Sequence, residues 1–66
     1  MSPKRFAMRL KQIREAKGMT QDALPKKVGV SRAYLARLEM GRHDPPLSRL
    51  GAIARALKTD IAALVK

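Results

Sequence analysis

The chain has 66 residues, which is room for one domain with one hydrophobic core, and a domain of this size is only marginally stable. It has one histidine and no cysteine, which excludes a disulfide framework and a structural zinc site. Lys and Arg number 15 against 5 Asp and Glu, a formal net charge of +10, so the composition points to nucleic acid or an anionic membrane surface as the partner. The aromatic residues, Phe6 and Tyr34, are too few for typical single-strand binding by base stacking, so duplex nucleic acid fits better.

The beginning of the chain gives no sign of export. No apolar run is long enough to span a membrane, and no secretory apolar core follows Met1. Residues 1–14 are Arg-rich and free of acids, as in an organellar transit peptide, but their apolar residues are needed for the core. We therefore expect a cytoplasmic protein of a bacterium or phage, associated with the nucleoid.

The first half of the chain predicts helices over residues 3–17 and 21–28. Phe6, Leu10 and Ile13 recur at helical spacing among basic residues, and Gly18 ends the first helix. The second helix carries Leu24 and Val28 after an N-cap threonine, and a glycine at position 29 ends it.

Three further helices are predicted over residues 32–40, 46–57 and 61–65. Ser31 caps the third helix, and Asp60 caps the fifth. The proline-rich stretch 42–46 is a loop by its turn chemistry. The expected core consists of Leu10, Ile13, Leu24, Val28, Val30, Leu35, Leu38, Leu50, Ile53, Leu57, Ile61 and Leu64.

The predicted fold is all-α: one compact five-helix domain over residues 1–66, with a helix-turn-helix. Strand alternation is absent and β-branched residues are scarce. Helix, a short turn containing Gly29, then helix is the helix-turn-helix arrangement. Glycine allows the positive φ that a tight turn between crossing helices requires.

The spacing of these residues resembles the Cro/repressor helix-turn-helix family, also called the xenobiotic-response-element family. The similarity runs from about Leu10 to Leu64. The residues that carry it are Arg14, Gly18, Gln21, Leu24, Gly29, Val30, Ser31, Leu38, Glu39, Gly41, Pro45, Leu50, Ala54 and Leu57. The resemblance implies a sequence-specific double-stranded DNA-binding transcriptional regulator, most naturally a repressor, whose third helix lies in the major groove.

The third helix has a face suited to reading base edges. At about 100° per residue, Leu35 and Leu38 face the core. The opposite arc holds Arg32, Ala33, Ala36, Arg37 and Met40. Arginine can bind guanine bidentately and alanine can touch a thymine methyl, so Arg32, Ala33, Ala36 and Arg37 are the predicted base contacts. A solvated basic face is the alternative, and Arg32 also suits a phosphate.

The resemblance implies phosphate contacts near helix ends and in the following loop by Gln21, Ser31 and Arg42, and the hydroxyl of Tyr34 is a further predicted phosphate contact. The alternative for Gln21 and Ser31 is that they only cap their helices. The alternative for Tyr34 is that its ring packs beside the core and only its hydroxyl end is exposed. His43 is expected to be a plain exposed loop residue.

Arg14 and Glu39 flank the apolar stripes of their helices, and the resemblance implies an ion pair between them. Glu39 is the only acid between Lys26 and His43, and an acid there would oppose phosphate binding. A structural pair therefore explains Glu39 better than an unrelated surface charge does.

Three positions depart from the family pattern. If Thr20 caps the second helix, Pro25 loses a hydrogen bond; if Asp22 does, Pro25 lies in the first turn and costs little. The resemblance favours Thr20, so replacing Pro25 by alanine is predicted to stabilise the fold by up to about 3 kcal/mol. Pro46 stands where the family often has a capping serine, so Asp44 or Ser48 is the expected cap. Lys58 replaces the usual glycine after the fourth helix, and we expect strain in that turn.

A single domain reads too few base pairs to select a site, so a two-fold homodimer on a palindromic site is expected. The predicted interface comes from the fourth and fifth helices: Leu57, Ile61, Leu64 and Val65.

The rival interpretations are an antitoxin or coactivator-type protein-interaction module on the same fold, and a membrane-active cationic helix. An enzyme is not expected, because no catalytic constellation or phosphate-cradling glycine loop is present. No cofactor, metal or small-molecule substrate is expected.

Overall fold

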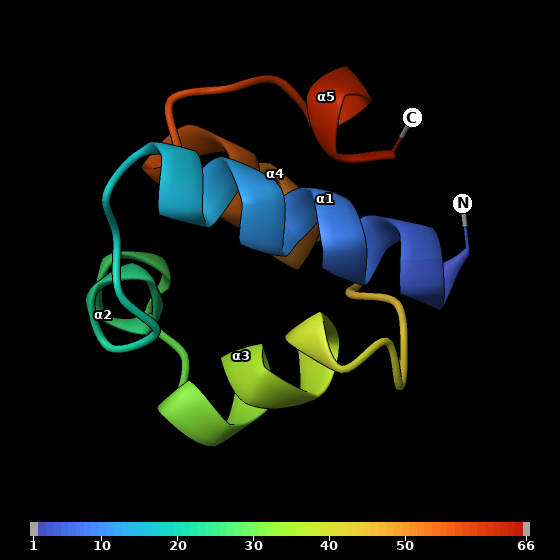
Figure 1. Ribbon diagram of the computed structural model, residues 1–66, viewed down its shortest axis with the longest axis horizontal. Coiled ribbons are helices and arrows are strands. Elements are labelled where there is room, and N and C mark those ends of the chain that lie inside the picture. Colours follow the sequence, from blue (N-terminus) through green and yellow to red (C-terminus); the bar gives the residue numbers. More distant parts are fainter. Residues whose placement is uncertain (1, 66) are drawn as a thin grey trace.

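The computed structural model describes residues 2–65, which form five α-helices and no strand. The helices are α1 (Pro3–Ala16), α2 (Ala23–Val28), α3 (Arg32–Glu39), α4 (Leu47–Ala56) and α5 (Ile61–Val65). In Figure 1, α1 crosses the molecule with α5 above it and α3 below it. α1 packs against both of these helices, and α2 packs against α4. The predicted all-α, five-helix class is confirmed.

α1 is fixed at its start and along its buried side. The Ser2 hydroxyl accepts a hydrogen bond from the Arg5 amide at 3.1 Å, which caps the helix, and Pro3 follows at a position where a missing N–H costs nothing. The Arg9 side chain donates through Nε to the carbonyl oxygen of Ala63 at 3.0 Å. α1 is thereby joined to α5 by a polar bond as well as by apolar packing.

α2 begins two residues later than the predicted boundary at residue 21. Thr20 Oγ1 accepts a hydrogen bond from the Ala23 amide at 3.1 Å, yet the regular helix starts only at Ala23. Pro25 has no N–H to bond the carbonyl of Gln21, so the helical hydrogen bonds cannot begin earlier. The regular helix therefore takes the start after Asp22 that was the second of the two expected alternatives, and Pro25 lies in its first turn, where its ring costs little.

The turn between α2 and α3 depends on Gly29, which has φ +83°. The amides of Gly29 and Val30 both donate to the carbonyl oxygen of Pro25, at 2.8 and 3.0 Å. A left-handed residue followed by this pair of bonds ends α2 sharply and turns the chain into α3. The Ser31 hydroxyl then accepts from the Tyr34 amide at 3.0 Å and caps α3.

The residue before α4 suits its backbone conformation, whereas the residue that turns the chain after α4 does not. Pro46 is the N-cap of α4, and among residues 2–65 no side-chain bond from Asp44 or Ser48 caps it, contrary to the prediction. Proline suits this position because its extended backbone leads into the helix without needing an amide proton. Lys58, after α4, has φ +55°. Among residues 2–65 it is the one residue other than glycine whose backbone is left-handed. The expected strain is therefore present at Lys58.

The core is built from side chains of all five helices. Its fully buried large side chains are Phe6, Leu10, Leu24, Leu35, Leu38, Ile53, Leu57 and Leu64. Of the predicted core, Ile13, Val28, Val30 and Ile61 are only partly buried. Phe6, Ala7 and Ala54 are buried although the predicted core omitted them. α1 buries a wide face because it contacts both α3 and α5, and Ala54 lies on α4, which contacts α2 and α5. None of the helices within residues 2–65 is long and apolar enough to cross a membrane.

Candidate nucleic-acid interface

The outer face of α3 carries the side chains predicted to contact bases. Arg32, Ala33 and Arg37 are exposed, and Ala36 is half-buried. Met40, directly after the helix, is 62% exposed. Leu35 and Leu38 on the inner face are buried, so the helix presents its guanidinium groups and small side chains outward as one surface. The structure therefore brings all four predicted base-contact residues onto one exposed face.

A buried ion pair fixes α3 to α1. The Arg14 guanidinium donates from Nε to Glu39 Oε2 at 2.6 Å and from Nη2 to Oε1 at 3.1 Å. The two side chains are 7% and 4% exposed. A bidentate arginine–carboxylate pair has a fixed relative orientation as well as a strong attraction, so it sets the position of the end of α3 against α1.

The remaining hydrogen-bonding groups of this pair are also used. Arg14 Nη1 donates to the carbonyl oxygen of Met19 at 2.6 Å, and Gln21 Nε2 donates to Glu39 Oε1 at 2.9 Å. A buried pair is tolerated only when such additional bonds compensate for lost hydration. The Gln21 amide thus points inward to Glu39, and the structure gives this residue a place in the network rather than on the phosphate-facing surface.

The other predicted phosphate contacts lie at the two ends of α3. Ser31 is exposed at the start of the helix, and its hydroxyl proton remains available to a ligand because the Tyr34 amide uses only the oxygen. Arg42 is exposed in the turn after α3. Tyr34 is half-buried beside the core. The arrangement places a hydroxyl donor and a cation at opposite ends of the exposed face.

Sequence reasoning missed a cluster around Tyr34. The Arg49 guanidinium carbon lies 4.9 Å from the centre of the Tyr34 ring, and the His43 ring lies 5.7 Å from it. A cation over an aromatic face is a favourable contact, so the side chain of Arg49 is oriented from α4 toward α3. His43 is half-buried rather than the plain exposed residue that was expected. No sequence pattern could have shown this cluster, because its members meet only when α4 packs near α3.

A second missed contact involves the predicted base-reading surface itself. Asp22 Oδ1 lies 3.4 Å from Arg32 Nε, and both side chains are more than half exposed, at 62% and 64%. An exposed pair of this kind is weak. It nonetheless places an anion beside one of the guanidinium groups predicted to contact bases.

The four residues predicted to form the dimer interface differ in how deeply they are buried. Leu57 is 1% exposed and Leu64 is 0% exposed, so both belong to the core and cannot form a dimer surface without unfolding it. Ile61 and Val65 are partly buried, and they leave some apolar surface on α5. The assignment of Leu57 and Leu64 to an interface was wrong, because helical periodicity does not distinguish a face buried within the chain from one buried by a partner.

Residues 2–65 contain no group of three or more His, Cys, Asp or Glu side chains that could hold a metal ion. The face of α3 carries guanidinium, hydroxyl and methyl groups. These groups bind by charge, hydrogen bonding and apolar contact.

Comparison with known proteins shows which family has this arrangement of helices. The sequence profile of a helix-turn-helix family matches residues 10–64, which include the buried pair, the glycine turn and all of α3. The chain belongs to this helix-turn-helix family.

Two relatives illustrate how far the similarity extends. An immunity repressor protein of Bacillus phage phi105 is 44% identical over 57 residues, which are 86% of this chain but 40% of the relative. The chain thus spans well under half the length of that phage protein. A helix-turn-helix-type transcriptional regulator of Archaeoglobus fulgidus is 41% identical over 56 residues, 85% of this chain and 80% of the relative.

Solved structures share the same helix-turn-helix architecture. The restriction-modification controller protein C.AhdI from Aeromonas hydrophila has a TM-score of 0.90 and 31% identity, and the alignment covers 94% of each chain. Hydroxypropylphosphonic acid epoxidase from S. wedmorenis has a TM-score of 0.92 and 34% identity, but the alignment covers only 35% of that chain. This fold therefore also occurs as a part of an enzyme, and the function has to be argued from the surface of this chain.

Proposed function

We propose that this chain binds double-stranded DNA sequence-specifically, with α3 in the major groove. The observation that carries the proposal is the outer face of α3: exposed Arg32, Ala33 and Arg37 on a helix held rigidly by a buried ion pair. A major groove admits one α-helix, and a face of arginines and alanines can approach base edges closely. Ala36 completes the reading face.

Phosphate groups are bound, in this proposal, at both ends of α3. Ser31 donates its hydroxyl proton at the start, and Arg42 supplies a cation in the turn beyond the end. Tyr34 contributes its hydroxyl from between them, with its ring held by Arg49. Gln21 is left out, because its amide nitrogen is bonded to Glu39.

The chain is further proposed to act as a transcriptional repressor on a palindromic site, as a two-fold homodimer. The phage relative is named as an immunity repressor, and the net charge of +10 suits a DNA ligand. Ile61 and Val65 give α5 the remaining apolar surface for a partner subunit. Since that surface is small, the dimer forms weakly in solution and is stabilised by adjacent half-sites on DNA.

Selection from random duplexes, followed by binding titrations at several salt concentrations, tests this function. The enriched duplexes should share one motif. The logarithm of the association constant should fall with the logarithm of salt concentration with a slope of about −5 or steeper for a dimer, because bound phosphates release their counterions. A flat salt response, or no enriched motif, would contradict DNA recognition.

A protein-interaction module on the same fold is the second candidate, because this architecture also occurs within a protein named as an epoxidase and so does not by itself imply DNA binding. It predicts a stoichiometric protein partner and no duplex preference. The duplex selection therefore separates the two candidates directly.

A further inference from the structure

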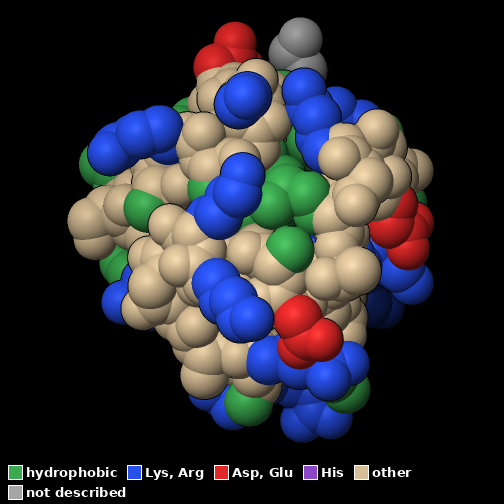
Figure 2. Space-filling model, turned by 90° about the vertical axis from the view of Figure 1, so that its left-hand side faces the viewer, with side chains coloured by type: hydrophobic (Ala, Val, Ile, Leu, Met, Phe, Trp, Pro, Cys, Tyr) green, Lys and Arg blue, Asp and Glu red, His purple; other side chains and the backbone are tan. Residues whose placement is uncertain are grey.

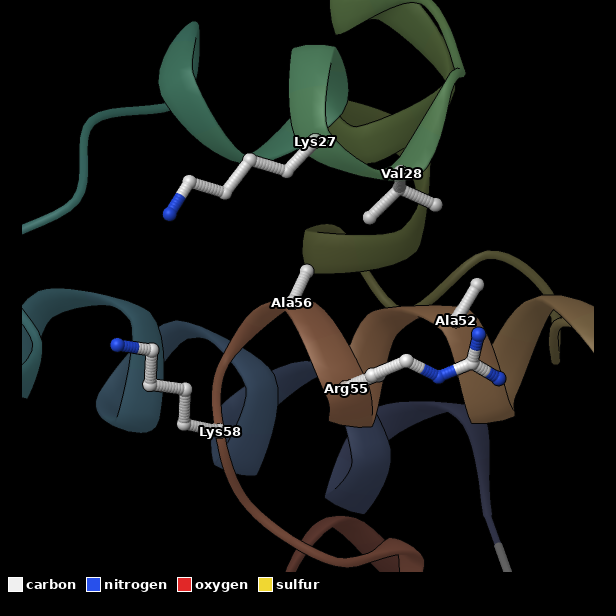
Figure 3. Close-up of a pocket in the computed structure, with 6 residues that line it drawn as sticks. All are labelled: Lys27, Val28, Ala52, Arg55, Ala56 and Lys58. Atoms are coloured by element: carbon white, nitrogen blue, oxygen red, sulfur yellow. The ribbon is translucent and has the colours of Figure 1, made fainter.

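An open apolar hollow lies between α2 and α4, away from α3. It has a volume of about 530 Å³ and is lined by Lys27, Val28, Ala52, Arg55, Ala56 and Lys58. In Figure 3, Val28 of α2 and the alanines of α4 point toward the same space, and the longer side chains extend around it. A smaller hollow of about 210 Å³ shares Lys27, Ala56 and Lys58 and extends to Lys17, Met19 and Leu57. Together they form one groove with a floor of small apolar side chains.

The rim of this groove is basic. Lys27, Arg55 and Lys58 surround the larger hollow and Lys17 the smaller, and no acidic side chain lines either. The ion pairs found among residues 2–65 use Arg14 and Arg32 and none of these rim cations. Figure 2, seen from the α2 side, shows Lys and Arg side chains around hydrophobic ones. The groove is therefore complementary to a ligand that is both anionic and apolar.

The groove is separate from the proposed DNA surface. None of its lining residues belongs to α3 or to the turn that follows α3. Its cations come instead from the ends of α1, α2 and α4 and from the turn after α4. A duplex held by α3 thus leaves these groups available.

We propose that this groove docks an acidic segment of a partner protein, which places an apolar side chain on the floor and carboxylates against Lys27, Arg55 and Lys58. A second copy of this chain would bring a further net charge of +10 against the basic rim and is disfavoured. A nucleic-acid backbone would meet the cations but has no apolar group for the floor. A small molecule would be poorly enclosed, because the hollow is open to solvent and good small-molecule sites bury most of their ligand.

The backbone of Lys58 adds an independent observation. Its φ of +55° is a conformation that glycine adopts more easily, yet the chain has a long cation there. Strain at a residue that lines a groove is expected where the side chain is used for binding. Lys58→Gly should therefore remove groove affinity without harming the fold.

The test is a selection of short random peptides displayed on phage against the whole chain. The enriched peptides should combine Asp or Glu residues with a Leu, Ile or Phe. Their synthetic versions should bind about tenfold more weakly to Lys27→Glu and to Lys58→Gly, as expected for loss of a charge partner at an interface. Lys11→Glu changes the net charge as Lys27→Glu does but lies on the exposed surface of α1 outside the groove, and should bind the peptides like the parent.

Three results would overturn the proposal. One is the absence of an acidic–apolar pattern among the enriched peptides, and another is equal weakening by Lys27→Glu and Lys11→Glu. The third is displacement of the peptides by a duplex, which would place them on α3. Thermal melts of each variant identify any that fail to fold. Arg37→Ala should retain peptide binding, so failure of the DNA proposal and failure of this one give different results.

Discussion

At the residue scale, the stability of the fold depends on the ion pair between Arg14 and Glu39, whose side chains are both buried. Glu39 accepts hydrogen bonds from Arg14 and Gln21, and its side chain is 4% exposed. Removing the carboxylate would leave the guanidinium buried without its counter-charge. Such a loss is far more costly than loss of a surface pair.

We therefore predict that Glu39→Ala lowers the free energy of unfolding by about 3 kcal/mol or more. Glu15→Ala is the matched control, because Glu15 Oε2 lies 3.9 Å from Arg14 Nη2 with a side chain that is 58% exposed. The control should change stability by about 0.5 kcal/mol or less. Chemical denaturation measures both variants, and equal midpoints would show that burial of the pair contributes nothing.

Two arginines on either side of the end of α3 should differ in what they recognise. Arg37→Ala removes a proposed base contact, so it should relax sequence preference at one position at a cost of about 1–3 kcal/mol. Arg42→Ala removes a proposed phosphate contact, so it should weaken binding to all duplexes alike and reduce the salt slope by about 1. Titration of matched and scrambled duplexes distinguishes them; a changed preference in the Arg42 variant alone would reverse the two roles.

At the element scale, the position of Pro25 in α2 reverses the effect on stability that was expected for its replacement by alanine. Pro25 is buried in the first turn of α2, where a missing N–H costs little. Its ring restricts the unfolded chain and fills space in the fold. Pro25→Ala should thus destabilise the protein by about 1 kcal/mol, instead of stabilising it, through greater unfolded-state entropy and lost apolar burial. A higher melting temperature in this variant would show that the proline strains the helix.

Local patterns were sufficient to predict the five helices, the caps Ser31 and Asp60, and the glycine turn, because each depends on neighbours in the sequence. The start of α2 was missed because a proline three residues into the helix decides it. The contact of Arg49 with Tyr34 depends on how helices pack together. Leu57 was predicted both for the core and for the dimer interface, and only the core assignment agrees with its burial. Spacing along one helix cannot show which other element covers it.

At the scale of the whole molecule, little of the predicted dimer interface remains on the surface. With Leu57 and Leu64 in the core, Ile61 and Val65 are the remaining candidates of the predicted interface. The net charge of +10 also opposes contact between two copies in the absence of DNA. Dimerisation should consequently depend on the duplex.

We predict a monomer in sedimentation of the free protein and a two-to-one complex on a full palindrome. Recognition helices of a two-fold dimer would lie about 34 Å apart, one turn of the duplex. Binding to the palindrome should be cooperative and tighter than binding to a single half-site. A one-to-one complex with equal affinity for both duplexes would refute the dimer.

The shortness of α3 has a consequence for how the protein opens. α3 has eight residues, and a helix of that length is unstable in water by itself. The helix is stable in the protein because Leu35 and Leu38 are buried in the core and Glu39 is paired with Arg14. It therefore cannot unfold by itself without disrupting the core. The backbone amides of α3 that follow its first turn are hydrogen-bonded and should then exchange with deuterium only through global unfolding, as slowly as those of α1. The surface proposed to read DNA thus belongs to the same cooperative unit as the core.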